Sequence, residues 1–319
     1  MRFACYRLHI LLSGALALNV SIVLAQDYPT RPVRLITSGI GGGTDFSARM
    51  IAQGLTEAPL GQPVVVDNRS SAQASDTVSK APPDGHVLLL VAGNLWIGPL
   101  LTKMPYDPIK DFVAISITNR SPNILAVHPS LPVKTVKDLI ALDRRSPGQI
   151  NFASASTGGM PHLAGELFNS MTGTKLVHIP YKGAAPATTD LLSGQVTLMF
   201  NNMLSAMPQV KAGRLRAVAV TSSKRSAAAP ELPTIAETVP GYEASGWYGA
   251  FAPAATSKEL IGRLNAEMNR IMKMPDVTQR LAGDGVEAVG TTPEQFGTYL
   301  KQEVAKWGKV VKASGAKAD

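Results

Sequence analysis

Short apolar runs of the kind that form strands alternate with helix-type segments along most of this chain. The strand-type runs fall at 33–37, 62–68, 86–93, 123–129, 148–156, 176–183, 196–202 and 215–222. Neighbouring parallel strands need crossover connections, which are usually helices, so regular alternation is typical of parallel sheets. The sequence therefore predicts an α/β fold with helices on both faces of its sheets.

Start and stop signals mark several of the helix-type segments. Thr135 and Asp138 have the spacing of a capping box, and so do Thr256 and Glu259. Gly173 follows an amphipathic segment, as expected for a glycine that ends a helix. The expected helices are 44–56, a short one near 76–80, 135–145, 162–173, 256–273, and a last one with Thr292 as its cap, Pro293 in its first turn and Gly315 as its stop.

The first 25 residues differ from the rest of the chain. Arg2 and Arg7 lead into a mostly apolar run over residues 8–24, and Val23-Leu24-Ala25 resembles a small-residue cleavage site. This pattern is typical of a secretory signal peptide. A membrane anchor is the alternative, but polar residues interrupt a run that is already short for a span. The only cysteine, Cys5, lies in this segment, so we expect an exported mature chain without thiol or disulfide chemistry.

The net charge is positive but not concentrated. Without Arg2 and Arg7 the 31 basic residues fall to 29 against 23 acidic ones, which leaves a charge of +6. The basic segment "KQEVAKWGKVVKASGAK" reads as a helix with a solvated lysine face and lacks interleaved stacking aromatics. We therefore expect no nucleic-acid binding. A positive field would still help to collect small anions.

A glycine-rich segment, "SGIGGGTDFSAR" at 38–49, joins the first strand-type run to a helix. No lysine follows the glycines, which argues against a nucleoside triphosphate loop, and the dinucleotide fingerprint lacks its last glycine. The remaining interpretation is that backbone N–H groups at a helix start bind an anion such as a carboxylate. A plain tight turn is the alternative. Asp45 would repel an anion, so we expect it to cap local N–H groups or hold water.

A second loop of the same kind lies in the middle of the chain. The segment "SASTGGMPHLAGELF" at 154–168 places small residues and a glycine pair before a helix. Extended stretches near 125 and 247 are suited to crossings between two lobes. We expect residues 26–124 and 249–319 to form lobe 1 and residues 125–248 to form lobe 2, with a ligand cleft between them.

Catalytic and metal-binding patterns are missing. The mature histidines His86, His128, His162 and His178 form no close pair with each other or with cysteine, and there is no G-x-S-x-G motif. The sequence therefore predicts no metal, no cofactor and no enzyme activity.

Several residues near the proposed cleft have two interpretations each. His162 either forms a structural hydrogen bond or contacts the ligand. Lys182 either attracts a second carboxylate or is a solvated turn residue. Trp96 and Trp247 either line the pocket or pack the hinge.

Ordered blocks from Tyr28 to the C-terminus resemble the periplasmic receptors of tripartite tricarboxylate transporters, often called Bug proteins. The blocks are "YPTRPVRLI", "GGGTD", "APLGQPVVVDNR", "PPDGHVLLL", "YDPIKDF", "HLAGELF", "VHIPYKGAAPATTDLLSGQV", "VKAGRLRAVAVTS" and "RLNAEMNRI". The resemblance implies a two-lobed α/β periplasmic binding protein of the type II-like, Venus-flytrap kind. In such proteins backbone N–H groups and ordered water from the two loops hold a ligand carboxylate.

The chain departs from the usual family pattern at positions near the cleft. Residues 37–42 read Thr-Ser-Gly-Ile-Gly-Gly where the family has Pro-Phe-Pro-Pro-Gly-Gly, so Ser38 replaces a pocket-lining phenylalanine. The segment after Asn68-Arg69 is shorter, Gly159 replaces a serine, Asn201 replaces a common aspartate and Trp96 replaces a small residue. These changes favour a roomier, more polar pocket and leave the identity of the ligand open.

We therefore expect a periplasmic receptor, a monomer, that captures a small carboxylate for the permease subunits of a tripartite tricarboxylate-type transporter. A ligand-sensing subunit of a membrane signalling kinase would use the same pocket and is the alternative. The candidate ligand-binding residues are Gly41, Gly42, Gly43, Thr44, Asp45, Asn94, Ser156, Thr157, Gly158, Gly159, His162, Tyr181, Lys182, Asn201, Asn202 and Trp247.

Overall fold

The structure is a computed structural model that describes residues 28–38, 43–57, 61–154, 157–181, 184–283 and 285–315. The expected signal peptide at residues 1–25 lies outside the described residues. None of the described helices combines the length and apolar character that a membrane span requires.

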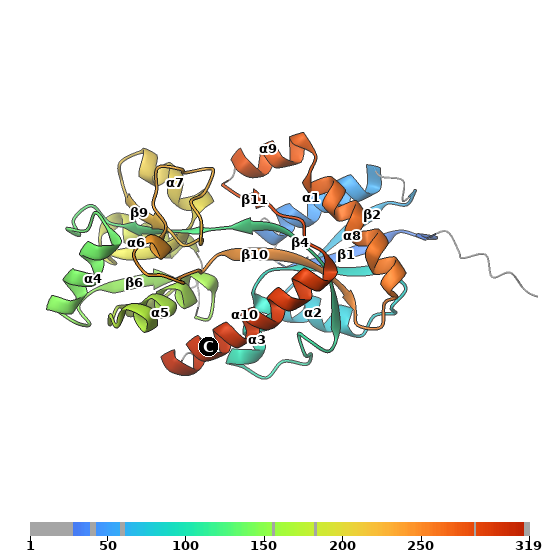
Figure 1. Ribbon diagram of the computed structural model, residues 1–319, viewed down its shortest axis with the longest axis horizontal. Helices are drawn as coiled ribbons and strands as arrows, with labels where there is room; N and C mark the ends of the chain where they lie inside the picture. The colour runs from blue at the N-terminus through green and yellow to red at the C-terminus, as the bar shows by residue number, and fades with distance from the viewer. Residues whose placement is uncertain are drawn as a thin grey trace, which may run out of the picture.

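The chain forms two β-sheets, each covered by helices (Figure 1). We call the two sheets with their helices lobe 1 and lobe 2. The sheet of lobe 1 has the order β11-β4-β10-β3-β1-β2, and that of lobe 2 has the order β7-β6-β8-β5-β9. The strands are β1 (Val33–Ser38), β2 (Val64–Arg69), β3 (Val87–Val91), β4 (Phe112–Ser121), β10 (Gly246–Pro253) and β11 (Glu287–Ala288) in lobe 1, and β5 (Asn123–Val127), β6 (Asn151–Ser154), β7 (Val177–Pro180), β8 (Leu198–Asn202) and β9 (Arg216–Val220) in lobe 2.

The helices follow the strands in the alternation that the sequence predicts. Lobe 1 contains α1 (Gly43–Glu57), α2 (Ser71–Ser79), α3 (Asn94–Leu101), α8 (Lys258–Met272), α9 (Pro275–Gly283) and α10 (Pro293–Ser314). Lobe 2 contains α4 (Val136–Arg145), α5 (Met160–Thr172), α6 (Ala184–Ser193), α7 (Met203–Lys211) and the short 3-10 helix Ile235–Glu237. The expected division at residues 124/125 and 248/249 stays a prediction.

The sheets are mixed, so the expectation of parallel sheets is wrong in part. β1 pairs in parallel with β2 and β3, but β10 is antiparallel to both β3 and β4. In lobe 2, β5 is antiparallel to β8 and β9. The reason is the crossing between lobes. β4 carries the chain towards lobe 2 and β10 brings it back, so these two strands run in opposite directions.

Of the five predicted helix caps and stops, four are confirmed, including Gly315 at the end of α10. Thr135 and Asp138 form the expected capping box, and Thr292 caps α10. Gly173 ends α5 in the left-handed conformation with a φ of 71°. The predicted cap of α8 is wrong by one residue, because Ser257 and not Thr256 accepts the first helical N–H, that of Leu260. Thr256 belongs to a turn after β10, in which its N–H bonds to the carbonyl of Pro253.

A hydrophobic cluster continues from one lobe into the other. It contains Trp96, Trp247 and Phe296 in lobe 1 and Phe152 and Phe168 in lobe 2. The last helix, α10, contacts α3 of lobe 1 and α5 of lobe 2, so it lies along both lobes (Figure 1). The crossing strands and α10 together form the connection that we call the hinge.

Candidate ligand-binding cleft

Three helix N-termini meet at one edge of the lobe 1 sheet. β1, β2 and β3 are parallel, so their carboxyl ends lie together, and α1, α2 and α3 begin within a few residues of those ends. Asn94 at the start of α3 donates from Nδ2 to the hydroxyl of Ser71 at the start of α2, at 3.1 Å. Since the N-terminus of a helix carries a partial positive charge, this edge favours an anion.

The first glycine loop is held at both ends. The hydroxyl of Thr44 donates to the carbonyl of Ser38, and the two hydroxyl oxygens lie 3.2 Å apart. Ser38, expected to enlarge the pocket, is thus used to join β1 to α1. Gly41 and Gly42 lie outside the described residues.

The carboxylate of Asp45 is bound by two neighbouring side chains, Asn68 and Arg49. Its Oδ1 accepts from Asn68 Nδ2 at 2.9 Å and lies 3.0 Å from the Nε of Arg49. The carboxylate is buried, with 5% of the residue exposed. These contacts tie α1 to the end of β2 and neutralise the negative charge beside the loop.

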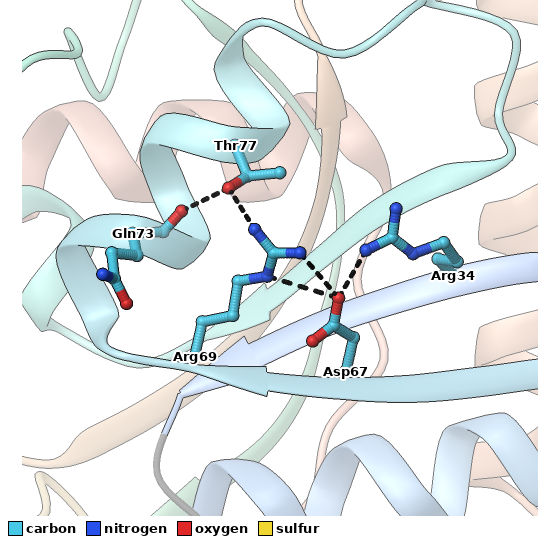
Figure 2. A network of polar contacts seen from close by, with 5 residues as sticks. All are labelled: Arg34, Asp67, Arg69, Gln73 and Thr77. Carbon is cyan, nitrogen blue, oxygen red and sulfur yellow. Dashed lines mark hydrogen bonds and ion pairs between the residues drawn. The ribbon is translucent and has the colours of Figure 1, made fainter.

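A network of polar contacts joins α2 to β1 and β2 at this edge of the sheet (Figure 2). Asp67 Oδ2 accepts from Arg34 on β1 and from Arg69 Nε and Nη2 at 3.2 and 3.1 Å. Arg69 also donates to the hydroxyl of Thr77 on α2, which in turn donates to the carbonyl of Gln73. The hydrogen bond from Arg69 lowers the pKa of Asp67, so the carboxylate stays charged and the network keeps β1, β2 and α2 together.

The second loop is held by a histidine. Nδ1 of His162 accepts the N–H of Gly158 at 2.9 Å, and the His162 ring stacks on His178 with a centroid distance of 3.7 Å. Nε2 of His178 lies 2.6 Å from the hydroxyl of Ser154, where β6 ends. This geometry supports a structural hydrogen bond for His162, the first of its two interpretations. Ser156 lies outside the described residues.

The second loop contacts lobe 1. Gly158 has a φ of 75°, and a Cβ atom there would lie 2.1 Å from Cδ1 of Leu101 on α3. Within the described residues no side chain caps the start of α5, where Gly159 is the N-cap. The loop therefore approaches α3 closely, with the N-terminus of α5 directed at the space between the lobes.

Two neighbouring pockets lie between the lobes. The inner pocket, of about 160 Å³, is lined by residues 92–94, Ile97, Ser121, Asn123, Met160, Pro161, Asn202, Gly246 and Tyr248. The outer pocket, of about 260 Å³, is lined by Ser71, Ala72, Asn94, Ile97, Gly98, Leu101, Thr102, Met104, Tyr106 and residues 157–159. Asn94 and Ile97 belong to both walls, so the pockets are adjacent.

Asn123 lines the inner pocket and carries a buried donor. Only 4% of the residue is exposed, and its Nδ2 has no hydrogen-bond partner among the described residues. On the neighbouring strand β8, Asn202 donates from Nδ2 to the hydroxyl of Ser121 at 3.3 Å. Because an unpaired buried donor costs free energy, a ligand oxygen in this pocket would be stabilised by Asn123.

The structure brings together part of the predicted site. Asn94, Thr157, Gly158, Gly159 and Asn202 line the two pockets. Gly43 and Thr44 lie at the start of α1, where a Cβ on Gly43 would come within 2.3 Å of the Tyr248 hydroxyl oxygen. Lys182 lies outside the described residues.

Two predicted residues, Asn201 and Tyr181, face away from the pockets. Oδ1 of Asn201 accepts from Ser205 on α7 at 2.8 Å, on the opposite face of β8 from Asn202. The Tyr181 hydroxyl donates to Asp190 on α6 at 2.7 Å. Burial and this hydrogen bond raise the pKa of Tyr181 to about 12.

Trp247 is fully buried in the hinge. Its ring stacks on Trp96 with a centroid distance of 3.8 Å, and its Nε1 donates to Glu303 on α10 at 3.3 Å. Trp307 donates to the same carboxylate at 2.8 Å. These contacts support the hinge-packing interpretation for both Trp96 and Trp247.

Sequence reasoning missed Ser121, Asn123, Met160 and Tyr248. Ser121 and Asn123 flank the point where β4 leads into β5, and Tyr248 lies on the returning strand β10. The extended stretches near 125 and 247 were the available signal, because side chains of a crossing must lie between the lobes. Within the described residues, no three His, Cys, Asp or Glu side chains gather where they could hold a metal ion.

Two α/β lobes, joined by crossing strands and enclosing pockets at the carboxyl ends of their strands, are the architecture of a solute-binding protein. The family model described as "Tripartite tricarboxylate transporter family receptor" matches residues 47–316. Protein BugT of Bordetella pertussis (strain Tohama I) is 37% identical over 303 residues, which cover 92% of this chain and 93% of BugT.

Solved structures agree in fold and in sequence. The structure titled R. palustris Rpa4515 with adipate has a TM-score of 0.78 and 38% identity, and the match covers 91% of this chain and 99% of the other. The periplasmic binding protein BugD has a TM-score of 0.74 and 32% identity, with 92% and 100% covered. This chain belongs to the receptor family of tripartite tricarboxylate transporters, as its sequence blocks predicted. It is a solute-binding receptor of the two-lobed kind, and the kinase-linked alternative gains no support.

Proposed function

We propose that this receptor is exported through residues 1–25 and captures a small carboxylate between its lobes for the permease subunits of a tripartite tricarboxylate-type transporter. It binds the compound as a monomer and releases it without turnover. The observation that carries the proposal is the buried, unpartnered Nδ2 of Asn123 in a pocket between the lobes. The adipate in the similar Rpa4515 structure supports a carboxylate as the ligand class.

The carboxylate is held by neutral donors and helix ends. Asn123 offers its amide N–H, Asn94 and Asn202 lie beside it, and the N-termini of α3 and α5 contribute positive partial charge. The glycine loops at 41–45 and 156–159 add backbone N–H groups, apart from the N–H of Gly158, which is bonded to His162. Because the side chains of Asn94, Asn123 and Asn202 already line the pocket before the ligand arrives, closing the lobes requires little reorganisation of these donors.

The first experiment is a thermal-shift titration of residues 26–319 with adipate and with its diamide. A ligand that binds only the folded protein raises the melting temperature. Because the helix N-termini favour a negative charge, we expect a shift with the acid but not with the diamide. A panel of mono-, di- and tricarboxylates at constant pH and ionic strength then identifies the preferred acid. Absence of any shift across the panel, in protein freed of co-purified ligand, would contradict the proposal.

Asn123 and Asn201 provide a matched pair of variants. Both are buried asparagines with an unpartnered Nδ2 among the described residues, and they lie on neighbouring strands. Only Asn123 lines the pocket, so Asn123→Ala should weaken binding of the best acid about tenfold or more, the expected loss for a hydrogen bond to a charged group. Asn201→Ala should leave affinity unchanged. Equal effects of the two variants would mean that Asn123 does not touch the ligand.

A further inference from the structure

A third cavity lies on the other face of the crossing strands. This hinge cavity has a volume of about 470 Å³, and its walls come from both lobes. It is lined by Arg120, Pro122, residues 222–228, Glu243, Ser245, Thr278, Ala282 and residues 285–288.

The pairing of β4 with β10 explains why this cavity is separate from the ligand cleft. Ser121 is paired with Gly246, and both line the inner pocket. The adjacent pair, Arg120 with Trp247, points to the opposite face because side chains alternate along a strand. Arg120 lines the hinge cavity. One two-stranded crossing therefore has a cavity on each side.

Two buried polar groups of the hinge cavity lack partners. Ser245 is 5% exposed and its hydroxyl has no hydrogen-bond partner among the described residues, and the same holds for the buried Nε of Arg120. The Arg120 guanidinium lies over the ring of Tyr299, 5.2 Å from its centroid, so its position is fixed by packing. A guanidinium and a hydroxyl that line the same cavity are suited to a carboxylate, which can accept from both.

The other charged groups of the cavity supply no net positive charge for a second carboxylate, because Glu243 and Glu287 outweigh Lys224. Arg225 is held by Glu237 through two bonds of 2.9 Å, whereas Lys224 is exposed and forms no ion pair with a described residue. Glu243 and the exposed Glu287 also line the cavity. Their negative charges would repel a second carboxylate on the same ligand.

We propose that the hinge cavity is a second binding site, for a small monocarboxylate held by Arg120 and the hydroxyl of Ser245. The ligand satisfies two buried groups that the fold leaves unpaired. It contacts a crossing strand and walls from both lobes, so its binding and lobe closure influence each other. By linkage, the factor by which it changes the affinity of the cleft for its ligand equals the factor by which the cleft ligand changes the affinity of the hinge cavity. This site does not depend on the nature of the cleft ligand.

Acetate is the probe, and acetamide and succinate are its matched comparisons. Binding is followed by the fluorescence of the tryptophans, since all three in the chain are buried around the hinge, and by calorimetry at constant ionic strength. The protein is the mature chain carrying Asn123→Ala, in which the cleft donor is removed. We expect saturable binding of one acetate, weaker binding of succinate and none of acetamide.

Two variants in this background assign the site. Arg120→Gln should weaken acetate binding about tenfold or more, because it removes the charged donor. Ser245→Ala should weaken it severalfold while leaving the melting temperature of the acetate-free protein unchanged or higher, since an unpaired buried hydroxyl is replaced by an apolar group. Lys137→Gln, which removes an exposed charge on α4, is the control for net charge and should have no effect.

The outcomes separate this proposal from the proposed function. The second site is overturned if acetate does not saturate, if acetamide binds as well as acetate, or if Arg120→Gln and Ser245→Ala bind acetate like the parent. Loss of adipate binding in Asn123→Ala alone, with acetate binding intact, supports both sites. Circular dichroism checks that each variant is folded, and Ser245→Ala serves as the test if Arg120→Gln fails to fold.

Discussion

Gly158 is the residue at which the contact between the lobes is most sensitive to a single methyl group. Its φ of 75° suits glycine, and the space where a Cβ would stand is already occupied by Leu101 of the other lobe. Its N–H is fixed by His162. Backbone conformation, loop position and lobe contact therefore all depend on the absence of a side chain here.

Gly158 and Gly173 allow the two effects of a side chain to be separated. Both have a left-handed backbone, with φ values of 75° and 71°, but a Cβ at Gly173 has nothing within 4 Å. Gly158→Ala and Gly173→Ala should each lower the free energy of unfolding by about 1 kcal/mol through backbone strain. Only Gly158→Ala should also weaken ligand binding, because it pushes α3 away from the second loop.

The measurement is urea unfolding of both variants together with titration of the best carboxylate. Leu101→Ala in the Gly158→Ala background creates the missing space and should restore part of the affinity. Equal binding by the two glycine variants would show that the contact with Leu101 does not accompany closure.

At the residue scale, sequence reasoning succeeds where a local pattern exists. For His162, whose helix follows a glycine pair, the sequence offered a structural hydrogen bond as one of two interpretations, and the bond from Gly158 supports that one. Asn201 and Asn202 illustrate the limit: neighbouring residues of a strand point to opposite faces, so only one faces the cleft, and the pairing of β8 with β5 decides which. Asn123 follows Pro122, where β4 leads into β5, and no local sequence pattern there indicates a pocket.

At the scale of elements, the network around Asp67 joins two strands and a helix and gives stability a defined pH dependence. The pKa of Asp67 is lowered by its hydrogen bonds to Arg69 and Arg34. A folded-state pKa below the unfolded value of about 4 means that this contribution is present above pH 4 and is lost as the pH falls through the folded-state pKa.

Asp67→Asn should therefore make the melting temperature fall less steeply than in the wild type as the pH decreases from 5 to 3. The variant is less stable than the wild type at neutral pH, and the difference narrows in acid. Thr77→Val removes the hydroxyl that accepts from Arg69 but no titrating group, so it should keep the wild-type slope. Identical slopes for Asp67→Asn and the wild type would contradict the assignment.

The start of α8 offers a test of the corrected helix cap. Ser257 accepts the N–H of Leu260 at 3.3 Å, whereas the hydroxyl of Thr256 is buried without a hydrogen-bond partner among the described residues. Ser257→Ala should cost about 1 kcal/mol of unfolding free energy, the usual loss for an N-cap. Thr256→Val should cost less, because no hydrogen bond is lost. Chemical unfolding measures the loss of unfolding free energy in both variants. A larger loss for Thr256→Val than for Ser257→Ala would show that Thr256 is the cap, as the sequence predicted.

Elements with strong periodicity were predictable, and those formed by long-range contacts were not. α4 and α5 have regular apolar spacing and clear end signals, so their existence and their C-terminal ends follow from the sequence, although α5 begins at Met160, two residues before the expected start. α3 is apolar on most sides because it packs against α2 and α10, and it contains Pro99, so no amphipathic pattern marks it. The antiparallel placement of β10 depends on a strand pairing that spans more than a hundred residues.

At the scale of the whole molecule, a buried carboxylate holds the hinge together. Glu303 of α10 is 3% exposed, accepts from Trp247 and Trp307, and forms an ion pair with Lys306. Since α10 contacts both lobes, motion between them must be accommodated around this group. The fold class and the two-lobed arrangement followed from the sequence, whereas this arrangement of the hinge required the structure.

The interleaved order of the strands also determines when a newly made chain can bind its ligand. Every strand of lobe 2 lies between residues 123 and 220, but the sheet of lobe 1 needs β10, at 246–253, to join β3 to β4. A chain that emerges N-terminus first can complete lobe 2 while lobe 1 still waits for its central strand. Lobe 1 thus begins first and is completed last, and the cleft forms only when most of the polypeptide is available.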